Sequence, residues 1–252
     1  MLKHRIIPTL LWSDGALVKG TEFNAWRSIG TVLPAVRVHC IREVDELLLL
    51  DIQATPQKTA LRCAELEAIS ESCRVPLTVG GGIRSVAQVR EILRSGADKV
   101  LVNSAAYEDT SLIGDIADAF GRQVLVVGVD VRRASNGEFL CLKNCGNEPT
   151  GRDLREWCLE VQRLGAGEIM IQSVSRDGTM AGLELEMVQA VVSDLRVPLI
   201  VSGGCSGYED MRLAFEAGAS AVAASALFQF TEATPAKAKA YLAAHGIAVR
   251  KG

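Results

Sequence analysis

The sequence predicts a single (β/α)8 TIM barrel, an α/β fold in which eight parallel strands alternate with helices. Short apolar runs alternate with amphipathic stretches along the whole chain. Eight such units in 252 residues average about 31 residues each, the length of a strand–helix–strand crossover. Several segments also recur at a constant spacing of 122 residues. This spacing indicates two duplicated four-unit halves, about 1–122 and 123–252.

The expected strands are near-continuous apolar runs, as a parallel sheet covered by helices requires. In order they are 5–11, 47–52, 76–80, 99–103, 124–130, 169–173, 198–202 and 221–225. The expected helices are the amphipathic stretches 57–72, 86–95, 109–120, 152–164, 183–194, 207–217 and 235–245. Ser85 and Ser206 stand before two of these stretches, in the position of N-terminal caps.

The repeat is clearest around two glycine-rich turns. PLTVGGG at 76–82 matches PLIVSGG at 198–204, and the segment 103–105 falls on 225–227 at the same offset. A constant offset favours a closed barrel over an open doubly wound sheet, the alternative that alternation alone leaves open. No linker rich in Pro, Gly or Ser divides the chain, so one domain over 1–252 is expected.

Composition argues against several classes of protein. With 27 basic and 30 acidic side chains the net charge is −3, which leaves no basic excess for binding nucleic acid. No apolar run has the length of a membrane span, and the N-terminus lacks a signal-peptide pattern. The seven cysteines include no CxxC pair, so we expect reduced thiols, mostly in the core, and a cytoplasmic protein. The three histidines lie far apart, so neither a metal nor another cofactor is expected.

The two glycine-rich turns predict a substrate. Each lies between a strand end and a helix start, where free backbone N–H groups bind anions, and each adjoins the end of the next strand. We therefore expect two phosphate sites facing each other across the barrel mouth, and a small-molecule substrate with a phosphate at each end. Glycines that serve only tight turns are the alternative. The residues are Gly81, Gly82, Asn103 and Ser104 in the first half, and Gly203, Gly204, Ala224 and Ser225 in the second.

Three carboxylates stand at or just after strand ends, where barrel active sites are built. They are Asp51, Asp130 and Asp177, and Lys19 and Gly178 lie on loops at the same rim. Asp130 ends an apolar run, so it is a candidate general acid or base. A salt bridge to Arg132, Arg133 or Lys19 is the structural alternative. The end of the first strand holds Leu11, which offers no second carboxylate.

Short motifs spread over the whole chain match one family. They are RII at 5–7, DG at 14–15, VKGT at 18–21, DEL at 45–47, LDI at 50–52, VGGGI at 79–83, GADKV at 96–100, VD at 129–130, GAGEI at 165–169, RDGT at 176–179 and SGG at 202–204. Through them the chain resembles the HisF family, the cyclase subunits of imidazole glycerol phosphate synthase.

The resemblance implies a barrel that forms a heterodimer with a glutaminase subunit of the HisH type at its N-terminal face. Ammonia from that partner would pass through the barrel to a bisphosphorylated ribulosyl aminoimidazole-carboxamide substrate. The product would be imidazole glycerol phosphate, an intermediate of histidine biosynthesis.

Two departures from the family lie on the catalytic face. The family's cyclase chemistry uses an aspartate pair at the ends of strands 1 and 5. Asp130 matches the second aspartate, but the first falls on Leu11, which cannot transfer a proton. The chain also diverges after Lys19, reading EFNAWRSIGTVLPAV at 22–36. The resemblance therefore implies a weakened cyclase.

The opposite face keeps the family's pattern. The resemblance assigns an ammonia gate at the barrel bottom to two basic and two acidic residues, which match Arg5, Glu46, Lys99 and Glu168. Asp98 matches a position on the face where the glutaminase docks. Each gate residue stands at the start of an expected strand, and two charges of each sign can balance. The alternative is a structural cluster of salt bridges that closes the barrel bottom and lets no ammonia through.

Two other functions remain open. The chain could be a non-cyclising ammonia conduit and glutaminase activator, supplying a third protein, an amidotransferase in nucleotide-sugar and surface-polysaccharide biosynthesis. It could also be the sister isomerase of histidine biosynthesis. That enzyme would need a carboxylate at position 11 and no charged gate.

Overall fold

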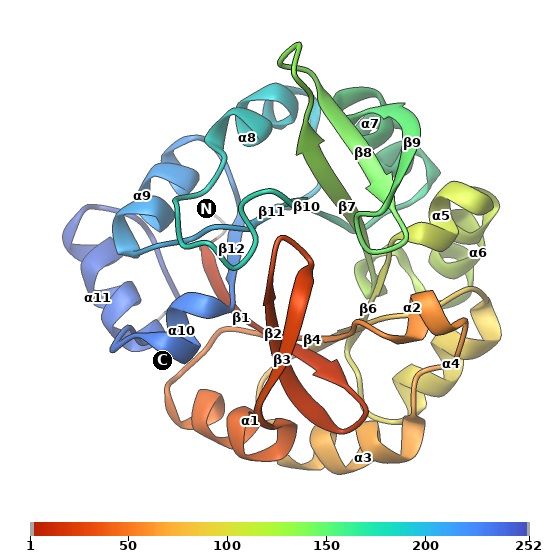
Figure 1. The fold of residues 1–252 in the computed structure, drawn as a ribbon, viewed down its shortest axis with the longest axis horizontal. Coiled ribbons are helices and arrows are strands. Elements are labelled where there is room, and N and C mark those ends of the chain that lie inside the picture. Colours follow the sequence, from red (N-terminus) through yellow and green to blue (C-terminus); the bar gives the residue numbers. More distant parts are fainter. Residues whose placement is uncertain (1–2, 251–252) are drawn as a thin grey trace.

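A closed ring of parallel strands forms the centre of the molecule (Figure 1). The structure is a computed structural model and describes residues 3–250. The last strand pairs with the first from Arg5 opposite Ala221 to Pro8 opposite Ala224, which closes the ring. The predicted (β/α)8 barrel is therefore confirmed. Its strands are β1 (Arg5–Ser13), β4 (Leu47–Asp51), β5 (Leu77–Gly80), β6 (Lys99–Val102), β7 (Leu125–Arg133), β10 (Glu168–Ser173), β11 (Leu199–Ser202) and β12 (Ala221–Ala224).

Both faces of these strands are buried, which explains their continuous apolar runs. Successive side chains of a strand point to opposite faces, so Ile6 joins the outer layer under the helices while Ile7 faces the barrel interior. The interior layer consists of small and branched apolar residues: Ile7, Leu48, Leu101, Val126, Met170, Ile200, Ala221 and Ala223.

The helices cover the outside of the barrel. They are α1 (Val32–Ile41), α3 (Cys63–Ser72), α4 (Val86–Arg94), α6 (Ser111–Phe120), α7 (Leu154–Leu164), α8 (Leu185–Val191), α9 (Tyr208–Glu216) and α11 (Pro235–Ala244), with short helices α2 (Ala54–Gln57), α5 (Ser104–Glu108) and α10 (Ala226–Phe230) at strand ends. The stretch expected to be helical over 57–72 forms a helix only from Cys63, after the separate turn α2.

One of the two predicted caps is confirmed. The side chain of Ser85 accepts a hydrogen bond from the backbone N–H of Gln88 at 3.3 Å and caps α4. The prediction for Ser206 is wrong, because α9 begins one residue later, with Gly207 at the cap position. Ser206 instead donates hydrogen bonds from its backbone and hydroxyl to the carboxylate of Asp210.

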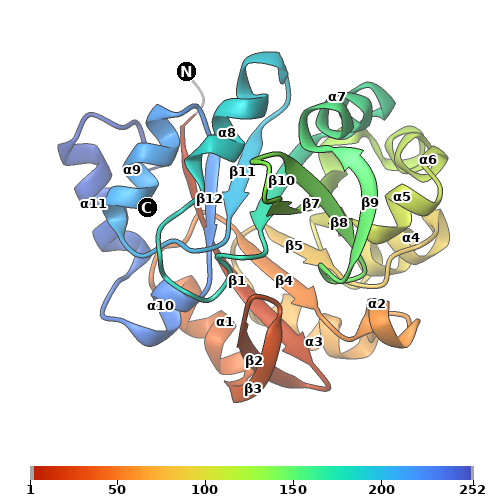
Figure 2. The same cartoon turned by 45° about the horizontal axis from the view of Figure 1, so that its top comes forward.

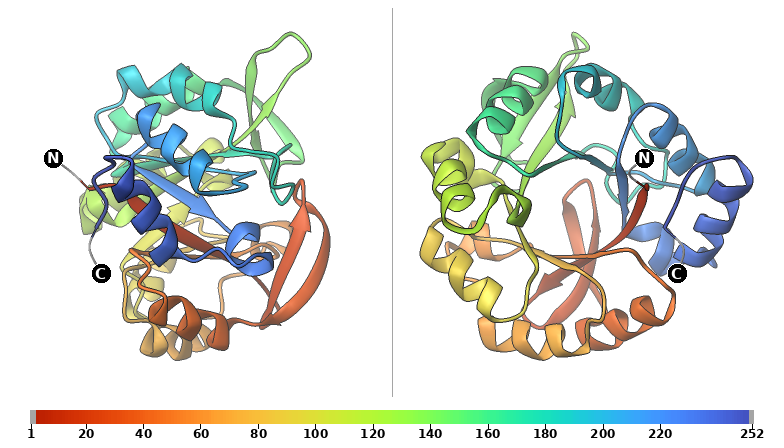
Figure 3. Two further views of the ribbon diagram at one scale, coloured as in Figure 1. Left: turned by 90° about the vertical axis from the view of Figure 1, so that its left-hand side faces the viewer. Right: turned by 180° about the vertical axis from the view of Figure 1, so that it is seen from behind.

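Two hairpins that the sequence did not predict rise above the barrel. β2 (Ala16–Thr21) and β3 (Asn24–Thr31) continue from β1, and β8 (Phe139–Lys143) and β9 (Glu148–Asp153) continue from β7. Figure 2 shows both hairpins on the same side of the barrel. In Figure 3 the chain ends lie on the opposite side, where His4 bridges to Val249.

The spacing of 122 residues recurs in the contacts of the glycine turns. A side chain at Gly81 would collide with the backbone oxygen of Asp51, and one at Gly203 with that of Ser173. The two pairs are related by the same offset. Both glycines have positive φ, +123° and +93°. Close approach of the preceding strand end therefore requires glycine at both positions, whatever else the turns do.

All seven cysteines lie in the described part of the chain and are free thiols. Cys141, Cys158 and Cys205 are buried, and the other four are half-buried, fewer in the core than expected. No helix within residues 3–250 has the length and apolar character needed to cross a membrane.

We expect Gly203→Ala to lose much more stability than Gly137→Ala. Both glycines have positive φ, +93° and +89°, but a Cβ at Gly137 meets open space. The Gly137 variant should lose about 1 kcal/mol from backbone strain alone, and the Gly203 variant about 3 kcal/mol or more. Urea unfolding of both variants measures the difference, and equal losses would contradict the close approach.

Candidate active site

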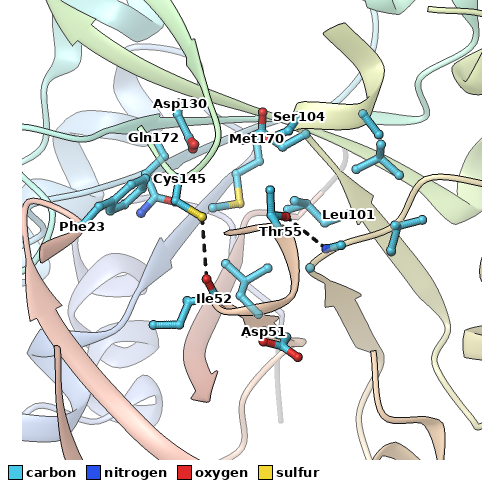
Figure 4. A pocket seen from close by; sticks show the side chains of 18 of the residues that line it. Phe23, Asp51, Ile52, Thr55, Leu101, Ser104, Asp130, Cys145, Met170 and Gln172 are labelled. Carbon is cyan, nitrogen blue, oxygen red and sulfur yellow. Dashed lines mark hydrogen bonds between the residues drawn. The ribbon is translucent and has the colours of Figure 1, made fainter. Parts of the chain in front are cut away.

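A large cavity opens at the carboxyl ends of β4, β5, β6 and β7, with about 920 Å³ of space that includes open solvent at its mouth (Figure 4). It brings together Asp51, Asn103 and Asp130, three residues that the sequence placed at the barrel mouth. Its other lining residues include Leu11, Phe23, Trp26, Gly81, Gly82, Ser104, Cys145 and Gln172. The side chains of Asp130, Gln172 and Cys145 lie near one another in Figure 4.

Asp130 is the buried carboxylate of this cavity. It lies beside Gln172 in the pairing of β7 with β10 and is 8% exposed. Burial raises its pKa to about 7. The hydrogen bond of the Asn103 side chain opposes this rise in pKa, and the negative charge of Asp177 adds to it. A group with a pKa near neutrality can both give and take a proton at physiological pH.

The salt-bridge alternative for Asp130 is wrong. Arg133 pairs with Glu184 at 2.8 Å, Arg132 donates a hydrogen bond to the backbone oxygen of Gly146, and Lys19 lies 3.7 Å from Asp177. Among residues 3–250, Asp130 takes part in no ion pair. Its carboxyl group therefore remains available to the cavity.

A second cavity of about 370 Å³ lies at the ends of β11 and β12. It contains Lys19, which is 3% exposed, and Asp177, which is 6% exposed. Burial lowers the pKa of Lys19 and raises that of Asp177, and in each case the partner's charge partly offsets the effect. The predicted residues Gly178, Gly203, Gly204, Ala224 and Ser225 line the same cavity.

Several polar atoms of the second cavity are buried without a hydrogen-bond partner in the described part of the chain. They are Lys19 Nζ, Asp177 Oδ2, Thr9 Oγ1 and Ser225 Oγ. Buried polar groups are nearly always paired, because an unpaired one loses its hydration without compensation. A group of them around one cavity is typical of a site that a polar ligand completes.

The first half differs in this respect. The Gly82 N–H donates to Thr55 Oγ1 at 3.2 Å, and Ser104 Oγ accepts from the backbone of Asn144 at 2.9 Å. Asp51 Oδ1 accepts from the backbone N–H groups at the start of α2. Asn103 Oδ1 is left without a partner. Most of the expected polar groups on this side are thus already bonded to neighbouring loops.

The hairpin β2–β3 lies in front of the ring of strands in Figure 1, and its Lys19 lines the second cavity. A hydrogen bond of 2.8 Å from the Glu22 N–H to the backbone oxygen of Asp177 holds the hairpin to the loop that follows β10. Phe23 and Trp26 of this segment line the first cavity, while Leu11 and Gln172 line both. Gln172 donates to Asp177 at 3.3 Å and so connects the two cavities.

Four residues that line the cavities were not predicted from the sequence: Gln172, Phe23, Trp26 and Cys145. Gln172 stands near the end of its strand, so the rule that identified Asp130 would also have found it. The aromatic residues lie in the divergent segment 22–36, and only the hairpin geometry brings them to the mouth. Cys145 reaches the cavity from the turn between β8 and β9, a hairpin that no pattern in the sequence predicts.

At the other end of the barrel, four charged residues form a closed ring. Arg5 contacts Glu46 at 2.8 Å, and Lys99 contacts Glu46 at 3.1 Å and Glu168 at 2.7 Å. Arg5 also donates to Glu168. Burial alone would raise the pKa of Glu168, but the hydrogen bonds and charges of Arg5 and Lys99 lower it. Every buried charge is therefore balanced, as burial requires.

The apolar interior layer separates the ring from the mouth. A very small cavity lies next to the ring, between Glu46 and the side chains of Ile7, Leu48, Val126, Met170 and Ile200. Asp98 lies beside the ring on the same face, where its carboxylate accepts a hydrogen bond from the N–H of Leu77 at 2.8 Å.

Comparison with known proteins identifies the family. A family model described as a histidine biosynthesis protein matches residues 5–233. The imidazole glycerol phosphate synthase subunit HisF of Chlorobaculum parvum is 41% identical over 251 residues, covering 99% of this chain and 100% of that protein. This chain belongs to the HisF family. HisF of a Thermotoga species is 41% identical over 250 residues, covering 99% and 98%. HisF of Dehalococcoides mccartyi is 40% identical over 251 residues, covering 99% of each chain.

At position 11, where the resemblance implied an aspartate, this chain has a leucine. Leu11 lies at the end of β1, beside Leu50 of β4 and Val18 of β2, and is 5% exposed. Its side chain takes part in the walls of both cavities. An apolar group thus occupies the place between them where a proton-transferring group was expected.

The stability of the chain should depend on pH through Asp130. Its folded pKa of about 7 exceeds the ordinary value of 3.8, so between about pH 4 and 7 the folded chain holds a proton that the unfolded chain has lost. Stability therefore falls as pH rises through this window. Asp130→Asn, which cannot titrate, should gain stability relative to the parent between pH 4 and 8, by about 2–4 kcal/mol.

Urea unfolding at a series of pH values measures this effect. Asp118→Asn, on the exposed face of α6, is the matched control and should follow the parent profile. A constant difference between the parent and Asp130→Asn across the range would contradict the raised pKa.

Proposed function

We propose that this chain is the ammonia-using synthase subunit of a cytoplasmic glutamine amidotransferase complex of the imidazole glycerol phosphate synthase type. Its partner is a glutaminase subunit of the HisH type, docked at the N-terminal face near Asp98. The observation that carries the proposal is the two-ended barrel, with a balanced charged ring at one end, two cavities that hold buried polar groups at the other and an apolar layer between them.

The ring and the interior layer suit ammonia. Charged groups at the entrance can bind ammonium, but an ion loses its hydration on entering the apolar layer. Neutral ammonia loses far less, so the layer favours the nucleophilic form. Arg5, Glu46, Lys99 and Glu168 would act as the gate to this path. The very small cavity next to Glu46 supports that role.

The mouth suits a ligand with two anionic ends. In the second cavity the proposed phosphate ligands are Lys19, Asp177 through its loop, Gly178, Gly203, Gly204, Ala224 and Ser225. Lys19 Nζ and Ser225 Oγ are buried there without a hydrogen bond in the described part of the chain, and as donors to phosphate they support this assignment. In the first cavity they are Gly81, Gly82, Asn103 and Ser104, with Asp51 beside them. Ligand binding there would exchange the internal hydrogen bonds of Gly82 and Ser104 for bonds to phosphate.

Asp130 would be the general acid or base between these ends. The bisphosphorylated ribulosyl aminoimidazole-carboxamide would place its reacting centre beside Asp130, where ammonia adds and the imidazole ring closes. The ring closure moves several protons, and Leu11 cannot take part in moving them. We therefore propose that the cyclase step is slow in this chain.

Leu11 also favours a second candidate function, a non-cyclising conduit. The charged ring is complete while the mouth lacks one proton-transferring group. A chain of this kind would activate the glutaminase and deliver ammonia to a third protein, an amidotransferase that modifies a nucleotide sugar for surface polysaccharide.

Replacing Leu11 distinguishes these two functions. With ammonium and the bisphosphate substrate, the parent chain should turn over about 10²–10⁴-fold more slowly than a family member with both aspartates. Leu11→Asp should recover at least tenfold. Leu11→Asn, of similar size but unable to transfer a proton, is the control and should recover nothing. Parent turnover within a few-fold of such an enzyme would exclude the conduit, whereas no turnover by the parent or Leu11→Asp would exclude the cyclase.

Lys99→Met tests the gate. The change leaves Arg5 alone against Glu46 and Glu168, so ammonia transfer should become inefficient. We expect glutamine-dependent turnover to fall at least fivefold while ammonium-dependent turnover stays unchanged, because the mouth is untouched. Glutamate released per product, measured in the complex, should rise. Lys237→Met on the exposed face of α11 is the control, and unchanged coupling in Lys99→Met would overturn the gate assignment.

A further inference from the structure

The N-terminal face of the barrel holds two neighbouring thiols that the mouth does not use. Cys40 lies in the last turn of α1, and Cys73 directly follows α3. The Cys40 sulfur donates to the backbone oxygen of Ser72 at 3.9 Å and accepts from the N–H of Arg74 at 3.5 Å. These two residues flank Cys73, so the two cysteine side chains lie side by side.

The Cys40 sulfur also affects the pKa of Cys73. Burial raises the pKa of the Cys73 thiol to about 11; a hydrogen bond to the backbone oxygen of Val75 opposes the rise, and the Cys40 sulfur and Asp98 add to it. The Cys73 sulfur donates to Val75 at 3.2 Å. Both thiols are half-buried and so reachable by small reagents, whereas Cys141 and Cys158 are 0% exposed.

The pair lies beside an exposed apolar patch. Val38 is 43% exposed and Ile41 is 81% exposed, and both belong to the same last turn of α1 as Cys40. Large apolar side chains with this exposure next to one another are typical of a surface that a partner covers. Asp98 binds the end of the segment that joins Cys73 to β5. A covalent bond between the two cysteines would therefore act on this face directly.

We propose that Cys40 and Cys73 are a redox-active dithiol, a modification site for low-molecular-weight disulfides that converts to an intramolecular disulfide joining α1 to the α3–β5 connection. One cysteine, as thiolate, attacks the reagent's disulfide and releases one reagent thiol. The second cysteine then displaces the other reagent thiol from the mixed disulfide. Two protein thiols are oxidised, one reagent disulfide is reduced to two thiols, and no other co-reactant is needed.

Oxidation would change the face beside the patch. Both S–H donors disappear, so the hydrogen bonds to Ser72 and Val75 are lost, and the end of α1 is tied to the segment after α3. This part of the inference rests on the proposed function: the glutaminase that docks on this face should bind the oxidised chain several-fold more weakly.

The chemistry is tested on the chain alone with oxidised glutathione at pH 7 and pH 9, followed by mass spectrometry of non-reduced peptides. We expect a Cys40–Cys73 cross-link that forms faster at pH 9, where more thiolate is present, and a rise in Tm of roughly 5 °C. Cys40→Ser and Cys73→Ser should stop at the mixed disulfide, and Cys63→Ser should behave as the parent. Absence of the cross-link in the parent, or cross-links spread over other cysteines, would overturn the proposal.

Docking is tested by titrating a HisH-type glutaminase with the reduced and the oxidised chain. The oxidised chain should bind at least threefold more weakly, and the variant that lacks both thiols should bind equally well before and after oxidant. Equal binding by the cross-linked parent would overturn the effect on docking. Failure of the reduced chain to bind would count against the proposed function, while the cross-link stands on the peptide measurement alone.

Discussion

Pairing of the last strand with the first is the constraint on which the rest of the molecule depends. Once β12 meets β1, every parallel strand has two neighbours, and all carboxyl ends lie on one rim. The same pairing brings residues from distant parts of the chain to that rim, such as Lys19 and Ser225 in one cavity. Closure also buries the interior side chains, so a molecule that passes through the barrel from one end to the other must pass between them.

The buried charged and polar groups differ between the two ends of the barrel. At the amino-terminal end of the barrel, each charge of the ring contacts a charge of the opposite sign, which offsets part of the desolvation cost without a ligand. At the mouth, Lys19, Asp177, Thr9 and Ser225 each have a buried polar atom with no hydrogen bond among residues 3–250. Buried polar groups are nearly always hydrogen-bonded, so these atoms are typical of a site that a polar ligand completes, whereas the charges of the ring already balance one another.

Periodicity predicted the barrel well because its strands are buried on both faces and its units are nearly equal in length. The order of strands, the place of Asp130 and the composition of the ring all follow from positions at strand ends. The hairpins could not be predicted in this way. β3 is mostly exposed and carries no alternating pattern, and its place over the mouth depends on a backbone hydrogen bond from Glu22 to Asp177. The absence of an ion pair at Asp130 among residues 3–250 could not be predicted either. It depends on the tertiary structure, in which Arg133 pairs with Glu184 and Lys19 with Asp177.

The ring at the floor also bears on the two halves of the chain. Residues 1–122 contribute Arg5, Glu46 and Lys99, while residues 123–252 contribute only Glu168. The charges do not balance within either half. The first half contributes two cations and one carboxylate, and the second half contributes one carboxylate. The repeat describes the backbone of this barrel, but its floor is asymmetric. The two halves of the chain are therefore not interchangeable, and the charges of the ring balance only when both halves contribute to it.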